Sequence, residues 1–164
     1  KNRVHLDVVL PAYAPLITYG AAVLEDHEVD GRRWNVLADA EGNELCVFPP
    51  DPDRDWASAL VVDASDAPAI AAWWAEVLDA PVTPGPDGAP RWLREVPGLP
   101  YDVWKFVPVP EEKTVKNRWH WDVVCDDVDA LVSRGATVLR TPDDEVRWHV
   151  LADPEGNEFC AFAS

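Results

Sequence analysis

The feature that most constrains the fold is a repeat whose two copies lie 115 residues apart in a chain of 164 residues. The segment Asn2-Arg3-Val4-His5-Leu6-Asp7 recurs as Asn117-Arg118-Trp119-His120-Trp121-Asp122. One residue is lost in a loop, and Glu41-Gly42-Asn43-Glu44-Leu45-Cys46 then recurs as Glu155-Gly156-Asn157-Glu158-Phe159-Cys160. About half of the aligned positions are identical, which chance does not give over this length. Residues 1–48 and 116–162 are therefore two copies of one module.

Each copy has the pattern of a β-α-β-β-β module. Alternating apolar and polar residues predict an opening strand at 118–124. Asp127 is the expected N-cap of a short helix, and Gly135 supplies the left-handed residue that ends it. The remaining elements of this copy are three strands, expected near 136–140, 147–152 and 158–162.

A third, diverged unit lies between the two copies. Ser65 or Asp66 is the expected N-cap of a helix in which apolar residues recur at helical spacing from Ile70 to Leu78. The Pro-rich stretch 81–90 is expected to be a loop. The strands of this unit are expected near 59–62, 91–95 and 103–107.

Composition excludes several classes of partner. The formal net charge of −16 argues against binding nucleic acid or an anionic membrane surface, because both need clustered Lys and Arg. No apolar run approaches the roughly 20 residues of a membrane span, and no signal peptide is visible. Three cysteines without a CxxC motif favour a reducing cytoplasm over a secreted disulfide scaffold. The chain contains no Met, and we interpret it as a fragment or a processed chain.

The module order, a His on each opening strand and the hairpin Asp153-Pro154-Glu155-Gly156-Asn157 together resemble the vicinal oxygen chelate superfamily. This superfamily includes glyoxalase I, the bleomycin-resistance proteins and the extradiol dioxygenases, and the motifs are most similar to its glyoxalase-like subgroup. The resemblance implies an α+β fold. In that fold two βαβββ modules pair, and their sheets form one cup-shaped mixed sheet around the site.

The resemblance also implies a domain organisation. Residues 57–163 are expected to form a complete two-module domain, and 49–56 a linker. Residues 1–48 would be the C-terminal-type module of a first, incomplete domain. Because a lone module leaves one sheet face uncovered, 1–48 is expected to pair with a missing upstream module or with a second chain in a homodimer. The alternative is internal pairing of 1–48 with 57–107, which would leave 116–162 without a partner.

Metal-dependent members of this superfamily carry ligands on the first and last strands of each module. His120 and Cys160 match two of these positions, but the partner module has Ala59 and, near the last-strand position, Val107. Neither side chain can donate a lone pair, so we expect no metal and no other cofactor. A divalent ion such as Zn²⁺ bound through His and Cys is the weaker alternative.

Alternation along the strands gathers the candidate site on one concave face. An alternative interpretation is that these polar side chains only pair with one another in a partly buried wall. No activating His or Lys stands at a recognisable spacing from the cysteines, so we predict no thiol nucleophile and name no catalytic residue. The candidate pocket wall comprises His120, Asp122, Trp148, Glu158 and Cys160, and in the first copy His5, Asp7, Glu44 and Cys46.

Two functions are compatible with these residues. The first is binding of a small organic molecule in an aromatic-lined cup without a catalytic metal, as the bleomycin-resistance proteins do. The alternative is a divalent-metal-dependent lyase, isomerase or dioxygenase of the vicinal oxygen chelate type. The feature that separates them is the set of metal-ligand positions, which is incomplete in this sequence.

Overall fold

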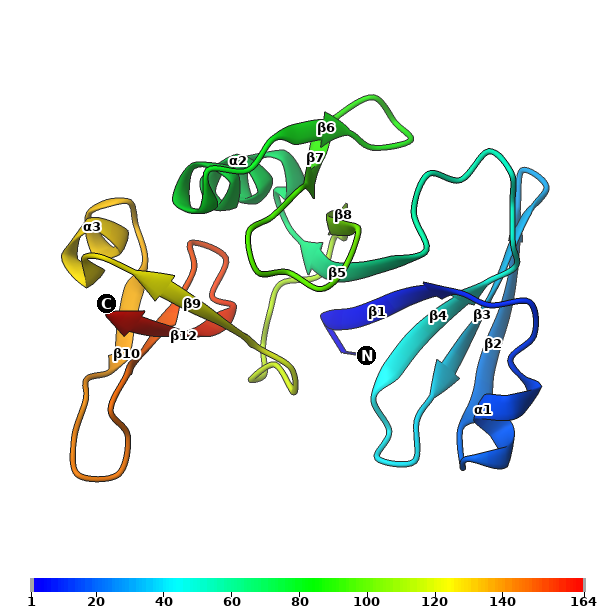
Figure 1. Ribbon diagram of the computed structural model, residues 1–164, viewed down its shortest axis with the longest axis horizontal. Coiled ribbons are helices and arrows are strands. Elements are labelled where there is room, and N and C mark those ends of the chain that lie inside the picture. The colour runs from blue at the N-terminus through cyan, green and yellow to red at the C-terminus, as the bar shows by residue number, and fades with distance from the viewer. Residues whose placement is uncertain (1, 164) are drawn as a thin grey trace.

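A computed structural model describes residues 2–163, so Lys1 of the repeat lies outside the described residues (Figure 1). All three segments form the β-α-β-β-β module that the sequence predicts. The first module is β1 (Val4–Val9), α1 (Ala14–Thr18), β2 (Ala22–Val29), β3 (Arg32–Ala38) and β4 (Glu44–Phe48). The second is β5 (Ser58–Ala64), α2 (Ala67–Leu78), β6 (Val82–Pro84), β7 (Pro90–Arg94) and β8 (Val103–Pro108). The third is β9 (Trp121–Cys125), α3 (Val128–Ser133), β10 (Thr137–Arg140), β11 (His149–Ala152) and β12 (Glu158–Ala163).

The helix ends follow the predicted local chemistry. The Asp127 carboxylate accepts a hydrogen bond from the Asp129 amide at 2.9 Å, and Asp66 caps α2 through the Ala69 amide at 3.1 Å. Gly135 follows α3 with a φ of +105°, a conformation that a side chain would strain. The prediction of a loop over 81–90 is wrong at one point, because β6 forms there. As an outermost strand, β6 tolerates Pro84.

The first two modules share one sheet. Its strand order is β2-β3-β4-β1-β5-β8-β7-β6, and its centre is the antiparallel pair β1–β5. Within each module the first strand runs parallel to the last, β1 with β4 and β5 with β8. Figure 1 shows β1 and β5 side by side at this seam. The third module forms a separate four-stranded sheet in the order β10-β11-β12-β9.

This arrangement corrects the predicted pairing of modules. The sequence predicts that the modules within 57–163 share a sheet and that 1–48 needs a partner from outside, whereas 1–48 pairs internally with the second module. β1 and β5 can pair because they carry matching apolar residues on the convex face. Val4, Leu6, Leu60 and Val62 join one core there. The third module keeps β9 at the edge of its sheet and packs through its other face.

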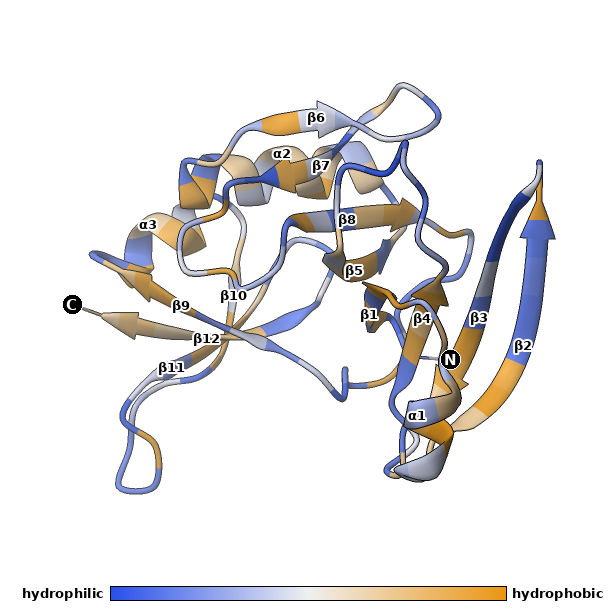
Figure 2. Cartoon of the chain, turned by 45° about the vertical axis from the view of Figure 1, so that its right-hand side comes forward, coloured by the Kyte–Doolittle hydropathy of each residue, from blue (hydrophilic) through white to orange (hydrophobic). Residues whose placement is uncertain are grey.

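Helix α2 holds the two sheets together. Trp74, fully buried, lies 5.0 Å from Trp104 of the large sheet and 5.0 Å from Phe159 of the small sheet, measured between ring centroids. Its Nε1 donates to the buried Asp153 carboxylate at 3.1 Å. Figure 2 shows apolar residues concentrated on α2 and the central strands, with long hydrophilic stretches on β2 and β3. The sheets therefore share one core, and their opposite faces are left to form sites.

Among the described residues, no helix combines the length and the apolar character that crossing a membrane requires.

Because Trp74 touches both sheets, we predict that Trp74→Ala lowers the free energy of unfolding by about 3–5 kcal/mol. Trp74→Phe keeps a ring but removes the donor to Asp153, and a smaller loss of about 1–3 kcal/mol is expected. Val124, 76% exposed, provides the control, since Val124→Ala should stay within about 0.5 kcal/mol. Urea denaturation measures all three variants. Equal losses for Trp74→Ala and Val124→Ala would contradict the shared core.

Candidate functional site

The concave side of the eight-stranded sheet contains a cavity of about 570 Å³. Both paired modules line it, and so does the connection between β4 and β5, which the sequence predicts to be only a linker. Its aromatic residues are Trp34, Phe48, Trp56 and Trp92. Its basic residues are Arg32, Arg54, Arg91 and Lys105, and its acidic residues are Asp7, Asp51, Asp53 and Asp55.

An ion pair between the two modules lies at the floor of this cavity. Lys105 Nζ of β8 donates to Asp7 Oδ2 of β1 at 2.8 Å, and both residues are buried. Burial lowers the pKa of Lys105, and the Asp7 carboxylate offsets part of that effect. Burial works to raise the pKa of Asp7, but hydrogen bonding to His5 and the charge of Lys105 outweigh it, so that pKa is lowered. Asp7 is therefore ionised at neutral pH.

Aromatic rings surround the Lys105 ammonium. Its Nζ lies 3.2 Å from the ring centroid of Trp56, 5.3 Å from that of Trp92 and 5.8 Å from that of Phe48. The negative faces of these rings attract a cation. The ammonium is thus held by one carboxylate and by three rings that come from both modules and their connection.

A second set of contacts orders the aromatic side chains of the cavity. Trp34 stacks between His27 and Phe48, with centroid distances of 4.8 and 5.9 Å. The Arg54 guanidinium lies 5.0 Å from the ring centroids of both Phe48 and Trp56. It also donates to the Pro49 carbonyl at 2.7 Å. The connection between the modules is fixed in this way over the aromatic wall.

Gly85 allows Arg91 to approach the backbone closely. A Cβ at this glycine would lie 2.7 Å from the Arg91 guanidinium carbon, so a larger residue would push that side chain away. The guanidinium donates to Asp87 at 3.0 Å and to the Phe106 carbonyl at 2.9 Å. Arg91 is therefore a second buried cation of the cavity wall, supplied by the second module.

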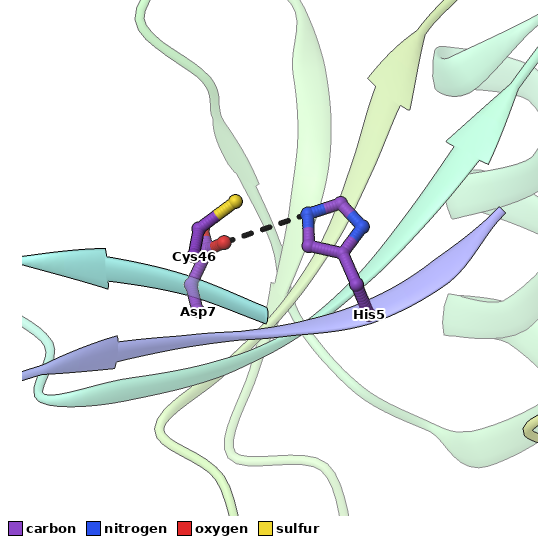
Figure 3. A group of neighbouring side chains, drawn as sticks. All are labelled: His5, Asp7 and Cys46. Carbon is purple, nitrogen blue, oxygen red and sulfur yellow. Dashed lines mark ion pairs between the residues drawn. The ribbon is translucent and has the colours of Figure 1, made fainter. Parts of the chain in front are cut away.

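Three predicted residues of the first copy do meet. Figure 3 shows His5, Asp7 and Cys46 pointing toward one another from β1 and β4, and His5 Nε2 lies 3.5 Å from Asp7 Oδ1. Burial raises the pKa of the Cys46 thiol to about 12, with a further contribution from the Asp7 charge. The thiol is therefore protonated at neutral pH, and the expectation that it is no nucleophile stays a prediction.

This first trio does not fit a catalytic metal ion. Its potential ligand atoms lie within 4.8 Å of one another, but the Lys105 ammonium already occupies the Asp7 carboxylate. Across the seam, Asp7 and His5 face Ala59 and Val61, which offer no lone pair. A divalent ion here would have to displace a buried ammonium and would gain no ligand from the second module.

The same trio recurs in the third module without a facing module. His120, Asp122 and Cys160 bring their ligand atoms within 4.8 Å of one another, as the alternation predicts. The His120 and Asp122 side chains are 51% and 63% exposed, whereas their counterparts His5 and Asp7 are 13% and 8% exposed. None of the three lines the 570 Å³ cavity.

The other predicted wall residues have different surroundings. Glu158 is held by Lys113 Nζ at 2.8 Å and by the Asn117 amide at 3.2 Å, and its counterpart Glu44 lines a separate cavity of about 240 Å³. Glu158 is therefore bound by residues of the neighbouring segment and Glu44 lies at the smaller cavity, and the role of these two carboxylates in a pocket wall stays a prediction. Trp148 lies opposite Phe162 as expected, with ring centroids 5.4 Å apart.

Sequence reasoning missed most of the residues that line the cavity. The repeat could have found Trp34 and Phe48, because they correspond to Trp148 and Phe162. Lys105 carried a usable signal as well, since it is the charged residue between Val103 and Val107 on one face of a buried strand. The sequence places the last-strand position near Val107, whereas the register pairs Val61 with Lys105 as it pairs Asp7 with Cys46. No pattern marked Trp56.

We predict that Asp7→Asn and Lys105→Met each lower the free energy of unfolding by about 3–5 kcal/mol, because each leaves a buried charge unpaired. The double variant should lose less than the sum of the two. The exposed pair Arg33–Glu28 is the control, and Arg33→Gln should cost at most about 1 kcal/mol.

The same pair sets a pH dependence. The pKa of Asp7 in the folded protein lies below its ordinary 3.8. Its stabilising contribution is therefore present above pH 3.8 and is lost as the pH falls through the folded-state pKa. The stability difference between wild type and Asp7→Asn should shrink below pH 3.8. The pairing of Asp7 with Lys105 would be contradicted if the losses of the two single variants simply added in the double variant. It would also be contradicted if the stability difference between wild type and Asp7→Asn did not change with pH.

The raised pKa of Cys46 predicts its reactivity. At pH 8 only about one thiol in ten thousand would be ionised at a pKa about four units higher. We expect iodoacetamide to modify the half-buried Cys125 long before Cys46, as mass-spectrometric mapping of a time course would show. Burial and the charges of Asp126 and Asp127 also raise the pKa of Cys125, so modification of Cys46 at the same rate as Cys125 would contradict this expectation.

Comparison with known proteins identifies the family and the fold of the chain. The family model of the glyoxalase-like domain matches residues 1–48 and 59–162. A point mutant of glyoxalase I from Zea mays superposes with a TM-score of 0.59 at 12% sequence identity, covering 98% of this chain and 69% of that one. Unmutated glyoxalase I from Zea mays gives 0.58 at 13% identity, covering 97% and 66%. No curated protein sequence matches.

At this level of identity the solved structures establish the fold alone, and the present chain spans about two thirds of their length. The family model, in contrast, matches nearly all of the chain, including both copies of the repeat and the diverged unit between them. The chain therefore belongs to the glyoxalase-like domain family, within the vicinal oxygen chelate superfamily.

Proposed function

We propose that this protein binds a small, planar organic molecule in the cup between its first two modules, without a catalytic metal. The observation that carries the proposal is the cavity of about 570 Å³ with four aromatic rings and a lysine ammonium at its floor. This volume lies in the range of small-molecule sites, which combine apolar walls with a few fixed polar groups. Aromatic walls favour a planar ligand, because offset stacking adds to the burial of apolar surface.

The residues at the floor of the cup favour binding of a small molecule rather than catalysis by a bound metal ion. Lys105 supplies one fixed positive charge next to Asp7, and the facing strand β5 supplies no ligand atom. An ammonium can donate hydrogen bonds to a ligand but leaves no open coordination position. The three free cysteines are consistent with a reducing compartment, and we propose the cytoplasm as the location.

A metal-dependent lyase, isomerase or dioxygenase is the second candidate. It is favoured by His120, Asp122 and Cys160, which bring three potential ligands together on an exposed sheet face. Elemental analysis of the purified protein separates the two candidates. About one Zn, Ni, Mn or Fe per chain, lost in His120→Ala, would support the second candidate at the expense of the first.

The binding proposal predicts that the neutral aromatic probe 2-naphthol binds with a stoichiometry of one per chain in isothermal titration calorimetry. Trp56→Ala should weaken binding about fivefold or more, because the probe loses a stacking surface. Trp148→Ala, which alters the third module, should leave the affinity unchanged. Loss of binding in Trp148→Ala but not in Trp56→Ala would move the site to the third module. No binding of either 2-naphthol or its carboxylate analogue 2-naphthoate at millimolar concentration would reject the proposal.

A further inference from the structure

The interior of the cup carries an excess of positive charge. Three basic side chains are 6–11% exposed, namely Lys105, Arg91 and Arg54. Among the described lining acids, Asp7 alone has comparable burial, at 8%, whereas Asp51 and Asp55 are 39% and 72% exposed. Water screens acids at the mouth far more than charges in the interior. The least exposed charges of the cup are thus mostly positive, whereas the whole chain has a net charge of −16.

The protein's own cations already occupy the aromatic faces. Lys105 and Arg54 lie against Trp56, Arg54 also lies against Phe48, and Arg94 lies 5.8 Å from the centroid of Trp92. A cationic ligand would have to displace one of these groups and would face the others at short range. The rings therefore do not form a free cage for a cation, although four rings around a cavity would otherwise suggest one.

We infer that the cup selects an aromatic ligand that carries an anionic oxygen, such as a carboxylate, over a neutral or cationic one of the same shape. The anionic group would meet Lys105, Arg54 and Arg91, while the ligand's ring would lie between the aromatic side chains, edge-on to those whose faces the cations cover. An arginine fork and an ammonium are the side chains that bind carboxylates most effectively. This inference rests on the proposed function and specifies its ligand class.

Three probes of one shape test it: 2-naphthoate, 2-naphthol and 2-naphthylmethylammonium, titrated calorimetrically into the 164-residue chain at pH 7. We expect 2-naphthoate to bind about tenfold or more tightly than 2-naphthylmethylammonium, with 2-naphthol between them. Equal affinities for all three, or tightest binding of the ammonium, would overturn the inference while leaving the proposed function in place. No binding of any probe would overturn both.

Arg54→Gln identifies the source of the selectivity without removing the buried ion pair. It should weaken 2-naphthoate about three- to tenfold more than it weakens 2-naphthol, because the lost positive charge affects only the anionic probe whereas the altered ring contacts affect both. Arg33→Gln alters an exposed arginine outside the cavity, 72% exposed and paired with Glu28, and should change neither affinity. Thermal unfolding confirms that both variants fold. An equal loss for 2-naphthoate and 2-naphthol in Arg54→Gln would contradict charge selection.

Discussion

The antiparallel pairing of β1 with β5 joins the first and second modules into one sheet. The register of this pairing determines which side chains meet in the site. The pairing sets His5 opposite Val61 and Asp7 opposite Ala59. Since Val61 is in turn level with Lys105 on β8, the ammonium comes within 2.8 Å of Asp7. A slip of one residue would turn every side chain of β1 to the opposite face and separate this pair. On the convex side, the apolar residues Val4 and Leu6 of β1 and Leu60 and Val62 of β5 pack in the core and thereby fix this register.

Local structure could be predicted from the sequence because its causes are local. The caps of α2 and α3 depend on Asp66 and Asp127 a few residues from the amides that they bind. The repeat fixed the module order, and alternation placed His120 and Cys160 on one face, as the structure confirms. For the caps and for the alternation along each single strand, the signal lies within about ten residues of the element that it predicts. Family membership could be predicted for the same reason, since its motifs are short and both copies carry them.

The pairing of modules could not be predicted in this way, because it depends on contacts between strand edges and sheet faces that lie far apart in the sequence. All three modules begin with an apolar strand, so the pattern does not say which two strands meet. The outcome is decided by packing on α2, where Trp74 touches Trp104 on one side and Phe159 on the other. Through these contacts the third module packs against α2 and does not extend the sheet of the second module. The third module therefore contributes none of its described residues to the 570 Å³ cavity. Trp56, from the connection between the first two modules, lines the cavity together with residues of those modules.

The two copies of the trio show that the chemistry of a motif depends on the module that faces it. In both copies the His, Asp and Cys bring their potential ligand atoms within 4.8 Å of one another, His5, Asp7 and Cys46 in the first and His120, Asp122 and Cys160 in the third module. In the first copy a facing module brings an ammonium and excludes water. Asp7 is therefore held as a buried carboxylate, and the pKa of the Cys46 thiol rises to about 12. In the third module, half or more of the His120 and Asp122 side chains is exposed, so water screens the same groups. Duplication of a module thus preserves the donor atoms, whereas the facing surface determines whether they act as a cation partner, a metal-binding group or an exposed polar patch.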